Sequence, residues 1–188
     1  ARRIPQWPKG LFGAGQDPLV QAPEQLAFSR ICKFPPHAAD RLVGALGIED
    51  SDRVLDVGSG VGILAQRLAS VLGDAGQAHA VEPIPALRDF SLPDSLTGSR
   101  SPDIRDARAE SLPFEANRFD VVLSHTLLNV LPGGNRSGVL REMCRVVRPG
   151  GTILGMDGVA GAQYWPAWIR GAAENEEVHR EFMELHRT

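Results

Sequence analysis

Cysteines, long apolar runs and an excess of one charge are scarce or absent in this sequence. Its two cysteines, Cys32 and Cys144, stand far apart and form no C-x-x-C pair, which argues against a zinc site and against a disulfide framework. So few thiols are typical of a reducing compartment. No apolar run approaches the roughly 20 residues that cross a bilayer. We therefore expect a cytoplasmic protein that holds no metal and has no membrane partner.

The charges of the chain are nearly balanced. It carries 20 Lys+Arg and 23 Asp+Glu, a formal net charge of -3, so the chain as a whole is not attracted to nucleic acid phosphates. Its start, Ala1-Arg2-Arg3, precedes no apolar stretch of the kind found in a secretory signal. With 188 residues, 43% of them hydrophobic, the chain is predicted to fold as one domain without a nucleic acid partner.

Residues 1–36 differ in composition from the rest of the chain. Their prolines and glycines interrupt both helices and strands; they are Pro5, Pro8, Gly10, Gly13, Gly15, Pro18, Pro23, Pro35 and Pro36. Between them stand too many apolar side chains for a solvated linker, including Trp7, Phe12, Phe28 and Phe34. We therefore predict an irregular arm or lid over residues 1–36 that packs on a folded domain of residues 37–188 or covers its site.

After residue 37 the hydrophobic pattern alternates between the periods of helix and strand. The predicted strands are 53–57, 77–82, 103–108, 119–124 and 152–157. The predicted helices are 37–48, 64–72, 85–90, 139–147 and a C-terminal segment over 164–188. Continuously apolar strands indicate burial on both faces. The pattern therefore predicts an α/β fold, with a doubly wound, mainly parallel sheet and helices on both faces.

The strongest functional signal is Val54–Gly62, where an apolar strand runs into a glycine turn and then a helix. Glycine lets the backbone approach a ligand closely, and the following helix offers free N–H groups. In open α/β sheets, ligands bind beyond the carboxyl ends of the strands. The glycines at 58, 60 and 62 read G-x-G-x-G, which differs from the G-x-G-x-x-G of dinucleotide sites. The alternative is a tight turn without a ligand.

An acidic residue ends the second predicted strand. Glu82 stands 20 positions after Gly62, where a carboxylate can accept hydrogen bonds from both hydroxyls of a ribose. Taken alone, Glu82 is more readily explained as a solvated charge at a strand end. Together with the glycine turn, it indicates a cofactor that carries a nucleoside.

Five features in order resemble the class I S-adenosylmethionine (SAM)-dependent methyltransferases, in particular the small-molecule type related to ubiquinone and menaquinone biosynthesis enzymes. They are Val54–Gly62, Glu82, Ala109–Phe114, Phe119–Val122 and Arg145–Gly151. The likeness spans roughly residues 50–157. It implies a Rossmann-like sheet of strand order 3-2-1-4-5, SAM as the cofactor, and methyl transfer to a small molecule.

The resemblance also implies roles for single residues. Asp56, Gly58, Ser59, Gly60 and Gly62 would hold the methionine end, Glu82 the ribose, Pro83 and Ile84 one face of the adenine, Ala109 and Glu110 its edge, and Ser124 and His125 would lie near the sulfonium. Many relatives carry an Asp where Arg108 stands, and Arg cannot accept a hydrogen bond from the adenine amino group. Either Glu110 or Asp106 replaces that Asp, or the backbone alone recognises the base, or cofactor binding is weaker; we favour Glu110.

Methyl transfer asks the protein mainly for alignment, because the sulfonium is already a good leaving group. His125 is the candidate general base, since histidine titrates near neutral pH and the end of its strand faces the crevice. Use of its backbone alone, or packing against the cofactor, explains this residue at least as well. Further candidates for the acceptor pocket are His37, Asp157, Tyr164 and Trp165, each of which also has a structural explanation.

Two other functions stay open. A nicotinamide-dependent oxidoreductase shares the glycine turn and the strand-end acid, although the G-x-G-x-G spacing counts against it. A non-catalytic regulatory or scaffolding protein with the SAM fold is suggested by Arg108 and by the short C-terminal part. Relatives usually continue into an antiparallel strand pair, which we expect to be absent. The sheet edge would then need cover from the arm, from a missing segment or from a partner chain, such as a second copy in a homodimer.

Overall fold

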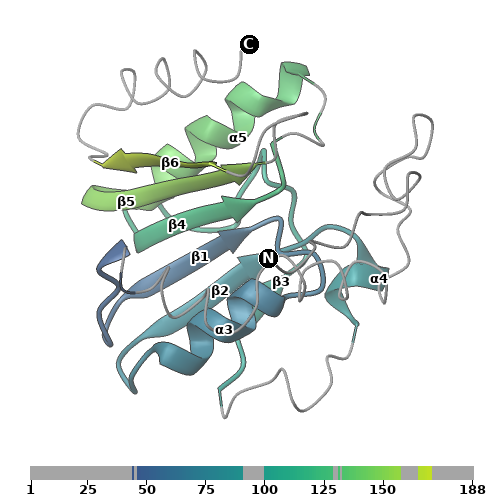
Figure 1. Cartoon of the computed structure of the whole chain (residues 1–188). Helices are drawn as coiled ribbons and strands as arrows, with labels where there is room; N and C mark the ends of the chain where they lie inside the picture. Colours follow the sequence, from purple (N-terminus) through teal and green to yellow (C-terminus); the bar gives the residue numbers. More distant parts are fainter. Residues whose placement is uncertain are drawn as a thin grey trace, which may run out of the picture.

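A mainly parallel sheet organises the part of the chain that the computed structural model describes, which is residues 44, 46–90, 100–128, 131, 133–157 and 165–170. The strands are β1 (Arg53–Val57), β2 (Gln77–Val81), β3 (Asp103–Arg105), β4 (Phe119–His125), β5 (Val147–Asp157) and β6 (Trp165–Arg170), and the helices are α3 (Ile63–Val71), α4 (Pro85–Arg88) and α5 (Gly133–Val146). The sheet order is β3-β2-β1-β4-β5-β6. Strands β1 to β5 are parallel, and β6 runs antiparallel to β5 (Figure 1). The predicted order 3-2-1-4-5 is confirmed.

Helices α3 and α5 cover opposite faces of the sheet (Figure 1). Side chains alternate along β1, so Val54 packs on the α3 side together with Leu68. The next residue, Leu55, packs on the α5 side together with Met143. Both strand residues are fully buried. This two-sided burial is what the continuously apolar strands predicted, and it confirms the doubly wound architecture.

Most predicted elements are observed within a few residues of their predicted bounds. β1 has its predicted bounds, and α3 ends one residue before the predicted end. Strand β3 and helix α4 are shorter than predicted, because they end at Arg105 and Arg88. Of the predicted helix 37–48, residues 44 and 46–48 are described; Gly44 and Leu46 are helical, whereas Gly47 and Ile48 are not, so the predicted end at residue 48 is wrong. The predicted arm or lid, residues 1–36, lies outside the described residues.

The segment that follows β5 differs from its prediction. Residues 165–170 form β6, with Trp165 opposite Asp157 and Arg170 opposite Thr152, so the predicted helix over 164–188 is wrong for this stretch. The spacing of its aromatic residues fits a helix, but β5 would otherwise leave a row of unpaired backbone groups, and aromatic residues suit strands well. Within the described residues, one antiparallel strand therefore pairs with β5, so the expectation that the C-terminal antiparallel strands are absent is wrong for this strand.

The Pro149–Gly151 segment lies inside β5 rather than before it. Val147 already pairs with β4, so the predictions of helix at this residue and of a later strand start are both wrong. The register between β4 and β5 shifts here, and Gly150 has a φ of 76°. A Cβ on Gly151 would lie 2.8 Å from the carbonyl oxygen of Asp120. The two glycines therefore permit an irregular strand start that the hydrophobic pattern did not reveal.

Asp120 joins three strands at the amino end of the sheet. One carboxylate oxygen accepts a hydrogen bond from the backbone N–H of Arg53 at 2.8 Å, and the other accepts one from Nε of Arg148 at 2.5 Å. Burial alone would raise the pKa of Asp120, but the hydrogen bonds from Arg53 and Arg148 outweigh it, so that the net pKa is lowered. Asp120 therefore stabilises the fold in its charged form.

We expect Asp120→Asn to lower the free energy of unfolding by roughly 1–3 kcal/mol at neutral pH, since hydrogen bonds to a charged group contribute about that much. Because the pKa of Asp120 is lower in the folded than in the unfolded state, its contribution is fully present above about pH 4 and is lost as the pH falls further. Urea unfolding across this range should show a flatter acid limb for the variant. Asp74→Asn, at a fully exposed side chain, is the control. An unchanged acid limb in Asp120→Asn would contradict this expectation.

Candidate functional site

The predicted site residues meet at the carboxyl edge of the sheet. Val57, the last residue of β1, pairs with Val81 of β2 on one side and with Ser124 of β4 on the other. The glycine turn follows Val57, Glu82 follows Val81, and His125 follows Ser124. Three stretches that lie far apart in sequence therefore converge, because parallel strands end at the same edge.

The glycine turn takes a conformation that other residues rarely adopt. The angle φ is 73° at Gly58, 58° at Gly60 and 78° at Gly62, all in the left-handed region. The N–H groups of Gly58 and Ser59 both donate to the carbonyl oxygen of Val81, at 2.9 and 3.1 Å. Helix α3 begins directly after Gly62 and has no side-chain cap, so the N–H groups of its first turn are available at this edge. Backbone geometry thus explains the G-x-G-x-G pattern.

Glu82 is a buried carboxylate beside this turn. The residue is 5% exposed. Its Oε2 accepts a hydrogen bond from the N–H of Gly60 at 2.9 Å, and its Oε1 accepts one from the N–H of Ile84 at 3.0 Å. The alternative of a solvated charge at a strand end is therefore wrong. The carboxylate connects the glycine turn to the segment that leads into α4.

An apolar surface adjoins Glu82 on the α4 side. Val61, Ile63 and Leu87 are buried together, and Ile84 and Phe90 pack against them half-buried. Next to this cluster, Pro83 is exposed. A flat base needs an apolar wall of this kind. The surroundings of Pro83 and Ile84 are therefore compatible with their predicted contact to adenine, which stays a prediction.

The loop after β3 carries the other predicted adenine contacts. Ala109 is buried, and Oε1 of Glu110 accepts hydrogen bonds from Arg108 at 3.0 Å and from Asn135 of α5 at 2.9 Å. Burial would raise the pKa of Glu110, but its backbone, Arg108 and Asn135 together lower it. The other substitute that we considered, Asp106, forms an ion pair with Arg88 at 3.2 Å. Either carboxylate would have to accept a hydrogen bond from the base in addition to the one from its arginine.

Two residues of α5 hold this loop in place, and sequence reasoning assigned neither of them a role. Glu142 accepts a hydrogen bond from the N–H of Leu112 at 2.7 Å. Arg145 donates to the carbonyl oxygens of Leu112 and Phe114 at 3.0 and 2.8 Å, and it also pairs with Glu142. Their spacing of three residues indicates only a helix ion pair. The pair anchors residues 112–114 and thereby supports the neighbouring Ala109.

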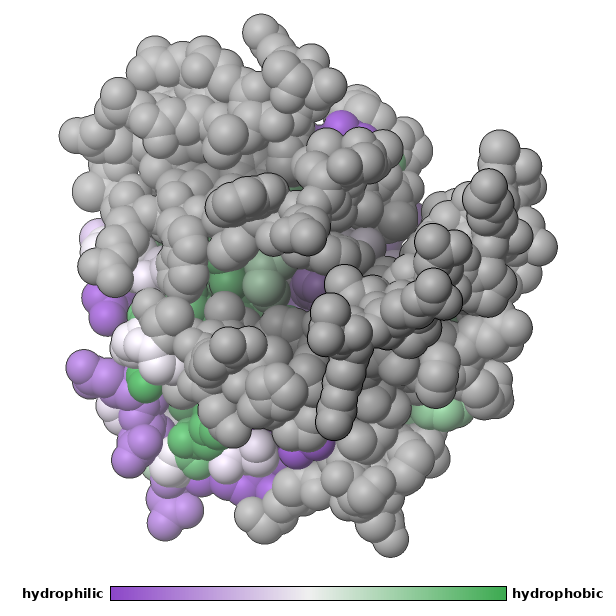
Figure 2. All heavy atoms as spheres, viewed as in Figure 1, coloured by the Kyte–Doolittle hydropathy of each residue, from purple (hydrophilic) through white to green (hydrophobic). Residues whose placement is uncertain are grey.

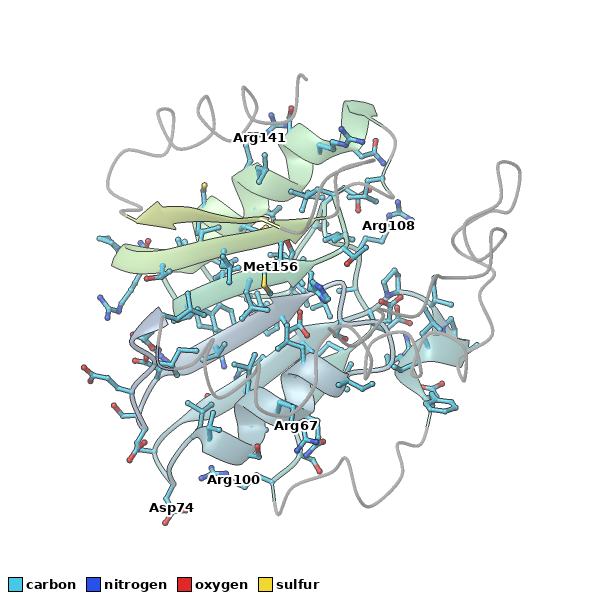
Figure 3. The ribbon with its side chains drawn as sticks, viewed as in Figure 1. Arg67, Asp74, Arg100, Arg108, Arg141 and Met156 are labelled. Carbon is cyan, nitrogen blue, oxygen red and sulfur yellow. The ribbon has the colours of Figure 1, made fainter. Side chains whose placement is uncertain are left out.

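The end of β4 supplies Ser124 and His125. Ser124 is fully buried and His125 is 8% exposed. Because side chains alternate, His125 shares the α3 side of the sheet with Asp56 of β1 and with its register partner Met156 of β5. Figure 3 shows Met156 on this side. The structure therefore adds Met156, which carried no signal in the sequence, to the surroundings of the candidate base.

The chain turns sharply after β4. Thr126 has a φ of 57°, which is unusual for a β-branched residue, and its N–H donates to the carbonyl oxygen of Met156 at 2.7 Å. The next residue, Leu127, reaches the glycine turn, since a Cβ on Gly58 would lie 2.8 Å from its Cδ1. The segment after β4 therefore packs directly on the turn after β1.

We expect Gly58→Ala to lower the free energy of unfolding by about 1–2 kcal/mol, because an L-residue in the left-handed region costs about that much. Part of the loss should come from the contact with Leu127. In a Leu127→Ala background the extra methyl finds space, so the two changes should couple by about 0.5–1 kcal/mol in a double-mutant cycle measured by urea unfolding. Additive effects would show that Leu127 does not restrict the turn.

A cavity of about 300 Å³ lies at the other end of the strands, bordered by His79, Arg100 and Asp103 among others. Arg100 there donates to the carbonyl oxygens of Gly73 and Gly76, and it lies beside Asp74 (Figure 3). On the visible face, the described hydrophilic residues gather toward this amino edge, on the left of Figure 2. The guanidinium thus closes the turn before β2, and this cavity is separate from the predicted site.

Two kinds of feature are absent from the described residues. No group of three or more His, Cys, Asp or Glu side chains among them could hold a metal ion. Within the same part of the chain, none of the helices is both long and apolar enough to span a bilayer.

Fold and site together define the class of the protein. The strand order, the glycine turn after β1 and the buried acid after β2 are those of the Rossmann-like, class I SAM-dependent methyltransferases. Residues 55–155 match a family profile described as a methyltransferase domain. This match covers more than half of the chain, and the chain belongs to this family.

The relatives cover different lengths of the chain. The ubiquinone/menaquinone biosynthesis C-methyltransferase of Ectopseudomonas mendocina is 34% identical over 113 residues, which are 57% of this chain and 42% of that protein. The glycine/sarcosine/dimethylglycine N-methyltransferase of Actinopolyspora halophila is 28% identical over 151 residues, 80% of this chain and 24% of that protein. The chain therefore spans less than half the length of these relatives. A solved SAM-dependent methyltransferase from Aquifex aeolicus shares the fold, with a TM-score of 0.60, 18% identity and 75% of each chain covered.

Proposed function

We propose that this chain binds SAM at the carboxyl edge of β1, β2 and β4 and transfers its methyl group to a small molecule. The observation that supports this proposal most is the buried carboxylate of Glu82, which lies within 2.9 Å of the Gly60 backbone nitrogen. A ribose placed beside the turn would donate its hydroxyls to this carboxylate. Family membership supports the same cofactor.

The polar atoms at this edge fit such a cofactor. The Oγ atom of Ser59 is buried and has no hydrogen-bond partner within the part of the chain that the structure describes. Buried hydroxyls normally have a partner, and the methionine end of SAM offers both a carboxylate and an ammonium. In the proposed arrangement Asp56 and the turn from Gly58 to Gly62 hold this end, and Ala109 and Glu110 border the adenine.

The chemistry that SAM supplies is an activated methyl group: the acceptor lone pair bonds to the methyl carbon while the carbon–sulfur bond breaks, leaving S-adenosylhomocysteine. The chain would align the acceptor with this bond and exclude water. For an acceptor that must lose a proton, we propose His125 as the general base, because it lies at the end of β4 and is almost buried.

The acceptor belongs to the same proposal. The names of the two curated relatives describe methyl transfer to nitrogen and to carbon, and both describe small-molecule acceptors. We propose this class of acceptor and assign no acceptor atom.

Residues 1–36 are proposed as the arm or lid over the site. We also propose a cytoplasmic location, from the paucity of cysteine, and a homodimer, because β6 forms one edge of the described sheet.

Calorimetric titration with SAM, S-adenosylhomocysteine and NADH tests the proposal. We expect SAM and S-adenosylhomocysteine to bind the same single site. NADH should not bind, because the glycine turn lacks the spacing of dinucleotide sites. Binding of NADH alone would instead support an oxidoreductase. No binding of any of the three to the folded chain would support a scaffolding role.

A further inference from the structure

Glu82 connects four segments of the chain. Its carboxylate accepts hydrogen bonds from the N–H groups of Gly60, in the glycine turn, and of Ile84, before α4. Its own N–H donates to the carbonyl oxygen of Arg105 at 3.1 Å, and its carbonyl oxygen accepts a hydrogen bond from Arg88 at 3.2 Å. Backbone and side chain are therefore both fixed before any ligand arrives.

The bond to Gly60 holds the middle of the glycine turn, between the N–H groups of Gly58 and Ser59, which donate to Val81, and that of Gly62, which donates to Ser59. Gly60 is buried with a φ of 58°, and it belongs to no helix or strand. A hydrogen bond to an ionised carboxylate is about twice as strong as one between neutral groups. Without the carboxylate, the N–H of Gly60 would be buried and unpaired unless the turn moved. The conformation of the turn at Gly60 thus depends on the side chain that follows β2.

We propose that Glu82 positions the glycine turn and residues 83–84, in addition to contacting the ribose. This inference rests on the function proposed above. The turn borders the methionine end of the cofactor, and Ile84 borders the adenine. Affinity for these two parts should therefore depend on Glu82 even though neither part touches its carboxylate. A site held ready in this way loses less conformational freedom on binding.

A ligand without ribose hydroxyls separates the two roles. We would titrate wild type and Glu82→Gln with S-adenosylhomocysteine and with its analogue lacking both the 2′ and 3′ hydroxyls. In the variant an amide NH₂ replaces one carboxylate oxygen, so one backbone N–H loses its acceptor. We expect the variant to bind the analogue about tenfold more weakly than wild type does, which corresponds to the loss of about one hydrogen bond. Asp103→Asn, at the start of β3, is the control and should bind both ligands as wild type does.

Hydrogen exchange on the unliganded protein tests the positioning role without any ligand. The amides of Gly60 and Ile84 should exchange slowly, as amides held by a buried acceptor do, and at least one of the two should exchange faster in Glu82→Gln. Unprotected Gly60 and Ile84 amides in wild type would overturn the inference. The inference would also be overturned if Glu82→Gln weakened the binding of S-adenosylhomocysteine but left the binding of the analogue unchanged. Failure of wild type to bind either ligand would overturn the proposed function, and this inference with it.

Discussion

Gly60→Arg is expected to lower the affinity for SAM and for S-adenosylhomocysteine by about a hundredfold or more, a loss of roughly 3 kcal/mol. Gly60 is buried and has a φ of 58°, a conformation that costs an L-residue about 1–2 kcal/mol, so the free variant relaxes to another shape of the turn and cofactor binding must reverse this change. The arginine side chain would in addition fill the space beside Glu82 in which the ribose is placed. Calorimetry on the purified variant measures the loss directly.

The control for this variant is Gly44→Arg. Gly44 is exposed, and a Cβ added there meets nothing within 4 Å. The same change in size and charge should therefore leave binding as it is in wild type. If Gly60→Arg folds and binds S-adenosylhomocysteine with wild-type affinity, the glycine turn is not the cofactor site.

Gly151→Ala is expected to lower the free energy of unfolding by about 2–3 kcal/mol, because overpacking against atoms that cannot move has costs of this order. The added Cβ would lie 2.8 Å from the carbonyl oxygen of Asp120 and 3.0 Å from that of Arg148. Both carbonyls belong to the paired strands β4 and β5, so relief requires a shift of the sheet. Urea unfolding, monitored by circular dichroism, gives the difference.

Gly138→Ala is the matched control for this substitution. Gly138 lies within α5, and the nearest atom to an added Cβ is 3.9 Å away. Alanine in a helix is favoured over glycine by about 0.5–1 kcal/mol, so this variant should be more stable than wild type. Equal stability of Gly151→Ala and wild type would show that the irregular start of β5 can accommodate a side chain.

The sheet and its glycine turn could be predicted from the sequence because their signals are local. An apolar run such as Val54–Val57 reads as a strand, and the glycines that follow have φ angles that few other residues tolerate. Glu82 could be placed at the end of β2 because the strand–helix–strand pattern of β1, α3 and β2 is readable in the sequence. Parallel strands then bring both to one edge without further information.

The remaining parts of the site depend on contacts between distant segments. Glu110 accepts a hydrogen bond from Asn135, and Leu127 packs against Gly58. The hydrophobic periodicity of the sequence predicts neither contact. The strand β6 was predicted as a helix because the spacing of Trp165 and Trp168 fits one face of a helix, and only the open edge of β5 favours a strand there. The additional role of Glu82 toward two backbone N–H groups is likewise visible only in three dimensions.

Chemical-shift mapping of the ¹⁵N-labelled chain with S-adenosylhomocysteine tests most directly where the cofactor binds. We expect the largest amide shifts at residues 58–62, 82–84, 109–110 and 124–125, the stretches that end at or border the carboxyl edge. Amides at the amino edge, such as those of Arg53 and Gln77, should be unchanged. Shifts confined to the amino edge, or to the cavity beside Arg100, would contradict the account.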